Sequence, residues 1–391
     1  MTDKDLSYDI AIVGAGPAGL SLVARLAEAP LRIALIERQS ESELASPPYD
    51  GREIALTRVS IARLKELGAW DHLSPGEAAP LGRAEVLNGS SPFVLSFGAS
   101  DREGPIGKLV SNAVIRRILF ETTCGQSNCH LITGESATFV GRDGERTRLQ
   151  LSGGRTLSAR LLVAADTRFS TLRKSLGIGA EMSDFGRTML VVRVAHEKPH
   201  NGVATEWFDH HQTIAMLPLR GDQSSFVLTL RADDMARIAA LSDADFLAEI
   251  ERRAQGRWGQ LTLASKPFCY PLVATYAHRF VKPGFALIGD AAVGMHPVTA
   301  HGYNFGLASA FALGKQLNGF ADLSAGLLWS RLQAYDREHR RATLPLFTTT
   351  NAIAKLYSDE RPAARFVRAA GLRAMQLAPG ARALVQARLL Q

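Results

Sequence analysis

The chain has 391 residues, of which 46% are hydrophobic and 21% charged, and it carries a net charge of +7. This length is enough for two domains or one large discontinuous domain, and the composition is that of an ordinary globular protein. The three cysteines form no CxxC pair, which argues against a disulfide framework or a zinc site and fits a reducing compartment. The positive charge suits an anionic cofactor or membrane surface, and equally an ordinary solvated surface.

The N-terminal segment and the apolar runs bear on where the protein works. The segment "MTDKDLSYD" is acidic and polar and shows no signal peptide. No apolar run approaches the ~20 residues that a membrane-spanning helix needs. We therefore expect a cytoplasmic protein, which could still contact the inner membrane peripherally.

Residues 8–39 predict a strand, a tight turn, a helix and a second strand. The segment "DIAIV" is a short β-rich apolar run, and "AGLSLVARLAEA" has the apolar spacing of a helix that Pro30 closes. The segment "RIALIE" predicts another buried strand. Together these segments indicate one βαβ unit.

The middle of the chain alternates helix and strand patterns. The segments "VSIARLKELGAW" and "SNAVIRRILFETT" predict helices, and residues 81–99 between them are irregular and strand-like. Strands joined by turns at "RDGE" and "SGG" follow in "ESATFVGRDGERTRLQLSGGRTLSARLLVAAD". The segments "TMLVVRVA", "TIAMLPL" and "SFVLTL" predict a mostly antiparallel sheet, and "DADFLAEIERRA" predicts a helix after it.

The segment "GDAAVGMHPVTAHGYNFG", residues 289–306, lies between the apolar runs "FALI" and "LASAFALG". After it the chain is mainly helical. The order α/β, then β, then α/β, then α predicts a nucleotide-binding domain that is interrupted by a sheet domain. The expected fold class is therefore α/β plus β.

A GxGxxG pattern, formed by Gly14, Gly16 and Gly19, lies at the predicted strand-to-helix turn. Gly14 permits the tight turn, Gly16 lets the backbone approach a pyrophosphate, and Gly19 lets the helix pack on the strand. The helix N-terminus presents partial positive charge to the phosphates. Glu37 ends the next strand, where an acid can bind ribose hydroxyls. The chain has only this one fingerprint, so if FAD is held permanently, we expect an NAD(P)H donor to bind transiently.

Residues 289–306 offer a second contact region. The strand "FALIG" would deliver Asp290 to its carboxyl end, where open α/β sheets bind ligands. Asp290 is either an acceptor for a polyol such as ribitol or a helix cap. Gly302 begins a near-apolar helix whose unpaired N–H groups would stabilise a reduced, negatively charged flavin. His296 and His301 have no further ligand at zinc spacing, so we expect no metal site.

The segments "GAGPAG", "ALTRVSIARLKELGAW", "AADTRFSTLRKSLG" and "GDAAVGMHPVTAHGYNFG" resemble, in order and spacing, those of single-component flavin aromatic monooxygenases of the para-hydroxybenzoate hydroxylase type. Within that group the chain is most similar to the ubiquinone-biosynthesis hydroxylases, to which "DGREIALT", "GKLVSNAVIRRIL" and "YDREHRRATLPLF" point. The resemblance covers about residues 8–377. Its motifs are specific for the fold and for FAD, and less specific for the substrate.

The resemblance implies a Rossmann-like FAD-binding domain that is interrupted by an antiparallel-sheet substrate domain. The FAD-binding domain is expected to comprise residues 1–78, 103–178 and 274–345. Residues 79–102 and 179–273 are expected to form the substrate domain, and residues 346–391 a C-terminal helical region.

The resemblance also assigns the FAD contacts. They are Gly14, Ala15, Gly16, Pro17, Ala18 and Gly19 at the pyrophosphate, Glu37 at the ribose, Asp290 at the ribitol, and Pro297, Gly302, Tyr303 and Asn304 at the flavin ring. Arg38, Arg52, Asn112 and Asp166 are further expected FAD contacts. Arg173 belongs with Asp166 to a middle motif linked to FAD and NAD(P)H. No residue is assigned as an acid or base, and Pro297 and His301 of the flavin loop are the candidates for a catalytic role.

Three positions depart from the pattern of the resemblance. The middle motif usually reads Asp-Gly, whereas this chain has Asp166-Thr167, and threonine disfavours the backbone angles that glycine permits. His301 replaces a glutamine and brings a titratable group to the flavin loop. Leu228 replaces a tryptophan of the substrate sheet, which predicts a roomier substrate site.

The resemblance implies that NAD(P)H reduces FAD, that O₂ adds to form a flavin C4a-hydroperoxide, and that its outer oxygen passes to an electron-rich phenol ring. The expected reaction is hydroxylation of a polyprenylated phenol in ubiquinone biosynthesis, similar to that of demethoxyubiquinol hydroxylases. The protein would position the ring against the predicted sheet and exclude water. The apolar strands suit a greasy substrate, and they equally suit an ordinary sheet core.

Alternatives to this interpretation remain open. The chain could be a flavin monooxygenase acting on another aromatic small molecule, or a non-catalytic flavoprotein subunit of a biosynthetic assembly.

The tail from Arg361 to Gln391 has six arginines and no acid. It could lie on an anionic membrane, dock on a partner of a biosynthetic complex, or pack on its own domain. We expect no nucleic-acid partner.

Overall fold

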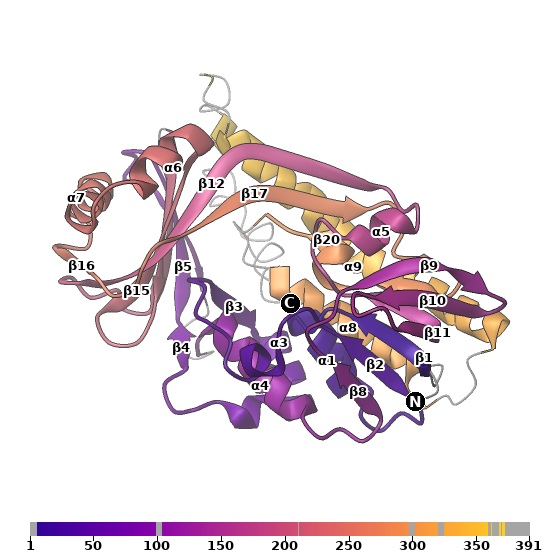
Figure 1. Ribbon diagram of the computed structural model, residues 1–391. Helices are drawn as coiled ribbons and strands as arrows, with labels where there is room; N and C mark the ends of the chain where they lie inside the picture. Colours follow the sequence, from indigo (N-terminus) through magenta and orange to yellow (C-terminus); the bar gives the residue numbers. More distant parts are fainter. Residues whose placement is uncertain are drawn as a thin grey trace.

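The computed structural model describes residues 6–98, 104–209, 211–296, 302–319, 324–358, 361, 367–368 and 370–371. Two large sheets and one small sheet organise this part of the chain (Figure 1). The first large sheet lies beside the helices α1, α8 and α9, and the second large sheet arches over the small one. The predicted fold class, an α/β part interrupted by an antiparallel sheet, is confirmed.

The first sheet has eight strands in the order β18-β19-β11-β1-β2-β8, and β10 and β9 extend it from β11. Its strands are β1 (Leu6–Val13), β2 (Ile33–Ile36), β8 (Cys129–Ile132), β9 (Ala137–Asp143), β10 (Arg146–Leu151), β11 (Thr156–Ala164), β18 (Val281–Lys282) and β19 (Phe285–Leu287). The pairs from β19 to β8 along this order are parallel. Every residue of β2 is buried, as expected for a parallel strand that is covered on both faces.

The helices of the first sheet are α1 (Pro17–Arg25), α2 (Glu41–Ala45), α4 (Asn112–Thr123), α5 (Thr171–Ser175), α8 (Gly302–Leu317) and α9 (Ala325–Ser358). The prediction carried α1 as far as Pro30, and this is wrong because α1 ends at Arg25. Asn128 explains the early end: its side-chain amide donates to the carbonyls of Leu26 and Ala29, at 2.9 Å each. These bonds replace the helical ones and turn the chain back toward β2.

The second sheet has nine strands in the order β20-β17-β12-β15-β14-β13-β5-β6, with β16 on β12. Its strands are β5 (Arg83–Asn88), β6 (Val94–Gly98), β12 (Ala180–His196), β13 (Val203–Asp209), β14 (Gln212–Pro218), β15 (Gln223–Arg231), β16 (Leu261–Leu263), β17 (Phe268–Ala277) and β20 (Val293–Gly294). Its pairs are antiparallel except for β13 with β5. Three separate stretches of the chain form this sheet: β5 and β6, then β12 to β17, and finally β20, which follows β18 and β19 of the first sheet. The exact domain limits remain the prediction given above.

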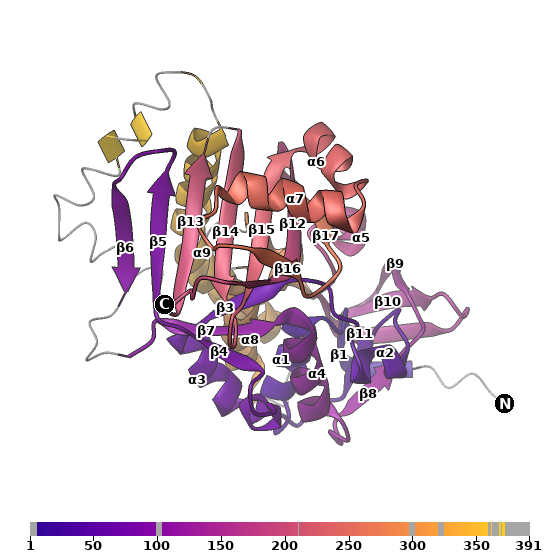
Figure 2. The same cartoon turned by 90° about the vertical axis from the view of Figure 1, so that its left-hand side faces the viewer.

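The two faces of the second sheet pack on different partners. Helices α6 (Ala232–Ala239) and α7 (Asp243–Ala254) cross one face (Figure 2). Their Met235, Ile238 and Phe246 form one core cluster with Leu190, Val192 and Val194 of β12 and with neighbouring strands. We call the opposite face, which carries Arg193 and Ala204, the inner face. Ala204 packs there with Leu109 of the small sheet.

Leu228 lies in the cluster beneath α6 and α7 and is fully buried. Successive strand residues point to opposite faces, so Leu228 points away from the inner face. The prediction that this leucine makes the substrate site roomier is therefore wrong. Its side chain fills the core under the covering helices instead.

The small sheet has the order β3-β7-β4, with β3 (Glu53–Thr57), β4 (Ala78–Leu81) and β7 (Gly107–Ser111). Helix α3 (Arg58–Glu66) and α4 begin directly after β3 and β7, and a 3₁₀ turn, η1 (Ala69–His72), follows α3. The hydroxyl of Thr57 caps α3 by accepting from the Ser60 N–H, and Ser111 caps α4 by accepting from the Val114 N–H. No described helix is long and apolar enough to cross a membrane.

Candidate functional site

The turn between β1 and α1 has the geometry that its glycines predict. Gly14 has a φ of +110°, and a Cβ there would lie 2.5 Å from the carbonyl oxygen of Ala165. A Cβ on Gly19 would lie 1.9 Å from the Gly14 oxygen. A Cβ on Gly16 would meet nothing within 4 Å. Two glycines therefore permit close packing, and the third leaves free space in front of the helix.

The N-terminus of α1 is open to an anion. Gly16 is its N-cap and Pro17 its first residue, and the helix has neither a side-chain cap nor an acid in its first turn. The first N–H groups of a helix lack intrahelical acceptors and carry the positive end of the helix dipole. A phosphate group in the space beside Gly16 would accept hydrogen bonds from these N–H groups, and the helix dipole would stabilise its negative charge.

Glu37 lies at the end of β2 with its carboxylate held in place. Its Oε2 accepts from the Ala15 N–H at 2.8 Å, and its Oε1 accepts from the Gln39 N–H at 3.0 Å. Each carboxylate oxygen has a second lone-pair site, so the group can still accept bonds from ribose hydroxyls. Arg38 beside it is exposed to solvent.

The structure brings Arg52 and Asn112 together around Asp50, which the sequence analysis did not identify. The Oδ2 of Asp50 accepts from the Arg52 guanidinium at 2.5 Å and from the Asn112 amide at 2.8 Å. Tyr270 of β17 donates its hydroxyl to the Asp50 carbonyl at 2.5 Å. The two predicted cofactor contacts therefore share one partner, and the second sheet anchors their segment.

Arg116 is a second residue that the sequence analysis missed. It follows Asn112 by one turn of α4 and donates to the Gln39 side chain at 2.5 Å. Burial lowers the pKa of Arg116, and the nearby acids Asp50 and Glu37 act in the opposite direction. The spacing from Asn112 was the available signal, since residues four apart share a helix face.

The middle motif begins where β11 ends, directly beside the glycine turn. Burial raises the pKa of Asp166, and its Oδ1 is buried without a hydrogen-bond partner among the described residues. Arg173 is buried and donates to the carbonyls of Ala291 and Arg168 at 2.8 and 2.9 Å. Thr167 is not among the residues with positive φ, so this turn does not need the glycine of the usual motif.

Asp290 lies in a 3₁₀ turn, η2 (Gly289–Ala291), at the end of β19. Its Oδ2 accepts from Arg168 at 2.9 Å, and Arg168 also donates to the Val273 carbonyl at 2.7 Å. The Asp290 side chain is 35% exposed. The acid is therefore oriented by an ion pair and keeps an accessible oxygen.

Helix α8 begins at Gly302, as predicted. A Cβ on Gly306 would lie 3.5 Å from Ala18, and one on Gly289 would lie 2.8 Å from it. Small residues thus let α1, η2 and α8 approach closely. Asn304 is buried, and its amide donates to the Ala55 carbonyl at 2.9 Å.

Two further residues are predicted to contact the flavin ring, and the structure describes only one of them, Tyr303. Burial raises the pKa of the Tyr303 phenol, which lies against the core beside α1. Pro297 and His301 lie outside the described residues. The same holds for nearly all of the arginine-rich tail. His296 is the last described residue before the predicted flavin loop. Burial lowers its pKa to about 4, and the nearby positive charge of Arg168 adds to this effect.

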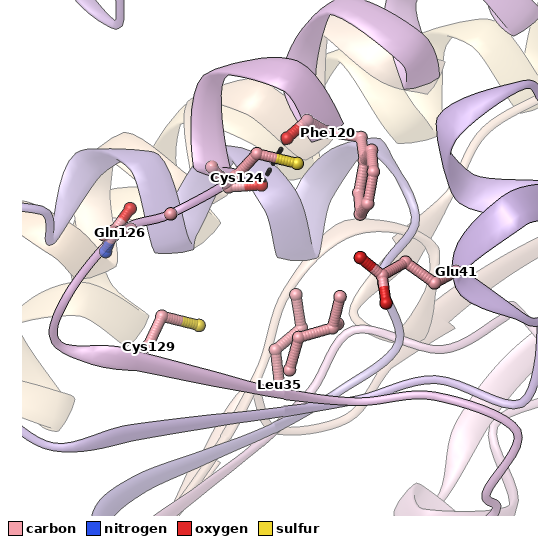
Figure 3. Close-up of a pocket in the computed structure, with 9 residues that line it drawn as sticks. Leu35, Glu41, Phe120, Cys124, Gln126 and Cys129 are labelled. Carbon is pink, nitrogen blue, oxygen red and sulfur yellow. Dashed lines mark hydrogen bonds between the residues drawn. The ribbon is translucent and has the colours of Figure 1, made fainter.

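A separate cavity of about 180 Å³ shares no residue with the predicted site (Figure 3). Cys124, Cys129 and Glu41 line it together with apolar side chains. Burial raises the pKa of Cys129 to about 11 and also raises that of Cys124. Both thiols therefore stay protonated at neutral pH and are poor nucleophiles and metal ligands. Within the described ranges no cluster of His, Cys, Asp and Glu could hold a metal ion.

Comparison with known proteins gives consistent results. The family described as FAD binding domain matches residues 7–344. The chain is 40% identical to ubiquinone hydroxylase UbiM of Neisseria meningitidis, with 98% of this chain and 85% of that protein covered. It is 29% identical to 3-demethoxyubiquinol 3-hydroxylase of Escherichia coli, with 95% of each chain covered. The crystal structure of PqsL, a probable FAD-dependent monooxygenase of Pseudomonas aeruginosa, superposes with a TM-score of 0.77 at 19% identity, covering 94% of this chain and 99% of that one.

Proposed function

The chain belongs to the FAD binding domain family, and on that premise we propose that it hydroxylates the aromatic ring of a polyprenylated phenol in ubiquinone biosynthesis. The observation that carries the proposal is the 40% identity to a ubiquinone hydroxylase along nearly the whole chain. The reaction would use FAD, NAD(P)H as a transient electron donor, and O₂. The proposed substrate class is that of a demethoxyubiquinol, by analogy with the Escherichia coli relative.

The residues around the glycine turn fit FAD. The free space at Gly16 and the uncapped start of α1 suit a pyrophosphate. Glu37 would accept from the adenosine ribose, and Asp290 would accept from the ribitol. The unpartnered Oδ1 of Asp166 lies beside the same turn and can accept a further bond. Arg52, Asn112 and Arg116 would complete the binding surface with positive charge and amide donors.

The bound flavin supplies the redox chemistry, because it takes electrons from NAD(P)H and, once reduced, activates O₂ for transfer of one oxygen atom. The chain itself orients the partners. The N-terminus of α8 would stabilise negative charge at the ring system. The inner face of the second sheet would hold the phenol ring and exclude water from it.

A direct assay tests the proposal. The purified protein with FAD is given NADH or NADPH and a demethoxyubiquinol with a short prenyl tail. NAD(P)H oxidation should rise with substrate, and a product with one additional oxygen should accumulate. A flavin that binds and is never reduced would identify a non-catalytic subunit instead, and reduction without any hydroxylated product would exclude this substrate class.

We further propose a cytoplasmic location with peripheral contact to an anionic membrane, since a polyprenyl substrate resides in the bilayer. The net charge of +7 and the arginine-rich tail support this contact. The protein should sediment with vesicles containing anionic lipid at low salt, and a variant ending at Ser358 should bind them several-fold less. Equal sedimentation of both proteins would exclude the tail as the membrane contact.

A further inference from the structure

Glu206 lies in the middle of β13 and points to the inner face of the second sheet. The neighbouring Trp207 belongs to the core cluster under α6 and α7, and the guanidinium of Arg257 lies 4.3 Å from its ring centroid. Adjacent strand residues point to opposite faces, so Glu206 points the other way. Ala204, two residues earlier on the same face, packs against Leu109 of the small sheet.

The carboxyl of Glu206 has apolar neighbours across both adjoining strands. In register it stands opposite Ala215 of β14 and Val86 of β5. No hydrogen bond or ion pair joins it to any other residue in the described part of the chain. The side chain is only half-buried, so a ligand on the inner face can still reach its oxygens.

Burial raises the pKa of Glu206 to about 8. Within the described part of the chain no charged group adds to this shift, and β14 and β5 present Thr213, Leu217, Ala84 and Asn88 around it on this face. Two cations of β12 lie on the same face: Arg193 binds Glu53 at 2.6 Å, and Arg187 donates to the His211 carbonyl at 3.4 Å. Glu206 is therefore mostly a neutral acid at pH 7, with one hydroxyl donor and free acceptor sites.

An unpaired acid at this position is unfavourable for the fold alone. Glutamate is depleted in strands, where β-branched residues are preferred. Ala215 and Val86 stand directly opposite it, so an apolar side chain would also suit this position. A residue type that does not fit its strand environment is expected where the side chain binds a ligand.

We propose that the Glu206 carboxyl forms a hydrogen bond with an oxygen substituent of the substrate's aromatic ring and thereby selects the ring orientation. The inference rests on the proposed function, in which the inner face holds the phenol. The neutral acid donates to a ring oxygen and can accept from a ring hydroxyl at the same time. After ionisation it can only accept, and a carboxylate would repel a phenolate.

Kinetics of variants of the FAD-bound enzyme test the inference. Glu206→Leu removes the hydrogen bond, and we expect the KM for the short-tailed demethoxyubiquinol to rise about tenfold or more, with more NAD(P)H consumed per product. Glu206→Gln keeps a donor, so its KM should stay nearer the wild-type value and should lose the rise above pH 8 that the wild type shows. Glu85→Gln is the matched control, because Glu85 lies on the neighbouring strand β5 with Arg83 as its partner.

Thermal unfolding separates a ligand-binding role from a structural one. The raised pKa means that the folded protein binds more protons than the unfolded chain between about pH 4.5 and 8, so the contribution of Glu206 to stability falls as pH rises through this window. The Tm of the FAD-bound Leu variant should therefore exceed that of the wild type, increasingly so from pH 5 to pH 8. A structural partner role predicts a lower Tm for both Glu206 variants and overturns the inference.

The outcomes also distinguish the inference from the function on which it rests. If the wild type makes no hydroxylated product from any prenylated phenol, the proposed function fails and this inference fails with it. If the wild type makes product and Glu206→Leu keeps the same KM, the same product and the same coupling, only the inference is overturned.

Discussion

The three glycines of the β1–α1 turn have two different roles: two of them are required by the packing of the fold, and the third is required only by a ligand. Gly14 and Gly19 are needed for packing, since a Cβ on either would lie within 2.5 Å of a backbone oxygen. Gly16 has no neighbour within 4 Å of its Cβ position, and the fold alone would accept a larger residue there. A glycine is therefore needed at position 16 only if a ligand, here the proposed FAD pyrophosphate, occupies the space in front of α1.

Two alanine variants test this separation. Gly16→Ala should leave the Tm of the FAD-free protein unchanged and weaken FAD binding about tenfold or more, because its methyl group would point into the pyrophosphate space. Gly19→Ala should destabilise the fold by about 1–3 kcal/mol, because the helix must move away from the turn. Thermal unfolding and flavin absorbance after desalting measure the two effects. Full flavin retention in the Gly16 variant would show that the pyrophosphate lies elsewhere.

Sequence reasoning predicted the residues of this turn because their roles are local. Gly14, Glu37 and Asp290 each stand at the end of a strand, and a strand end can be recognised from a short segment. Arg116 had a local signal that was overlooked, namely its spacing from Asn112 on α4. Asp50 had none, because it meets Asn112 and Tyr270 only in the folded protein. Such contacts have no signature in a short segment.

The strand β12 is the element that joins the second sheet to the predicted cofactor half. Arg193 of β12 binds Glu53 of β3 at 2.6 Å, and the Glu53 side chain is only 2% exposed. The Arg193 guanidinium also lies 4.3 Å from the ring centroid of Tyr49. Tyr49 and Glu53 flank Asp50 and Arg52, so this contact fixes the segment that carries two of the site residues.

A double-mutant cycle tests this link. Arg193→Met leaves the Glu53 carboxylate buried without its partner and should cost about 3 kcal/mol of unfolding free energy. Adding Glu53→Leu to that variant should restore most of the loss, because no charge remains buried. Chemical denaturation with all four proteins gives the coupling. Additive effects of the two changes would show that the pair does not hold the segment.

At the level of elements, the sequence predicted strands and helices where their periodicity is strong. It missed β13, although it identified the neighbouring β14 and β15. The segment "VATEWFD" of β13 has Glu206 where a strand usually has an apolar or β-branched residue. Glu206, which breaks the strand pattern, is also the residue for which we infer a ligand. The strand β13 is recognised in the structure by its pairing with β14 and β5.

The molecule as a whole places a cofactor half beneath the inner face of a sheet. The first sheet and α1 present the glycine turn, and the second sheet arches over the small sheet (Figure 1). The order of α/β and β segments predicted this division correctly. The proposed reaction requires both halves, because in the proposal one holds FAD and the other holds the ring that receives oxygen.

Product analysis after reaction under isotopically labelled O₂ shows directly whether the protein inserts an oxygen atom from O₂ into the aromatic ring. With FAD, NAD(P)H and a short-tailed demethoxyubiquinol, the product should gain one oxygen atom, and mass spectrometry should find that atom labelled. The label should be absent when the labelled atoms are supplied as water. A product whose new oxygen comes from water, or steady NAD(P)H oxidation with no hydroxylated product, would contradict the account.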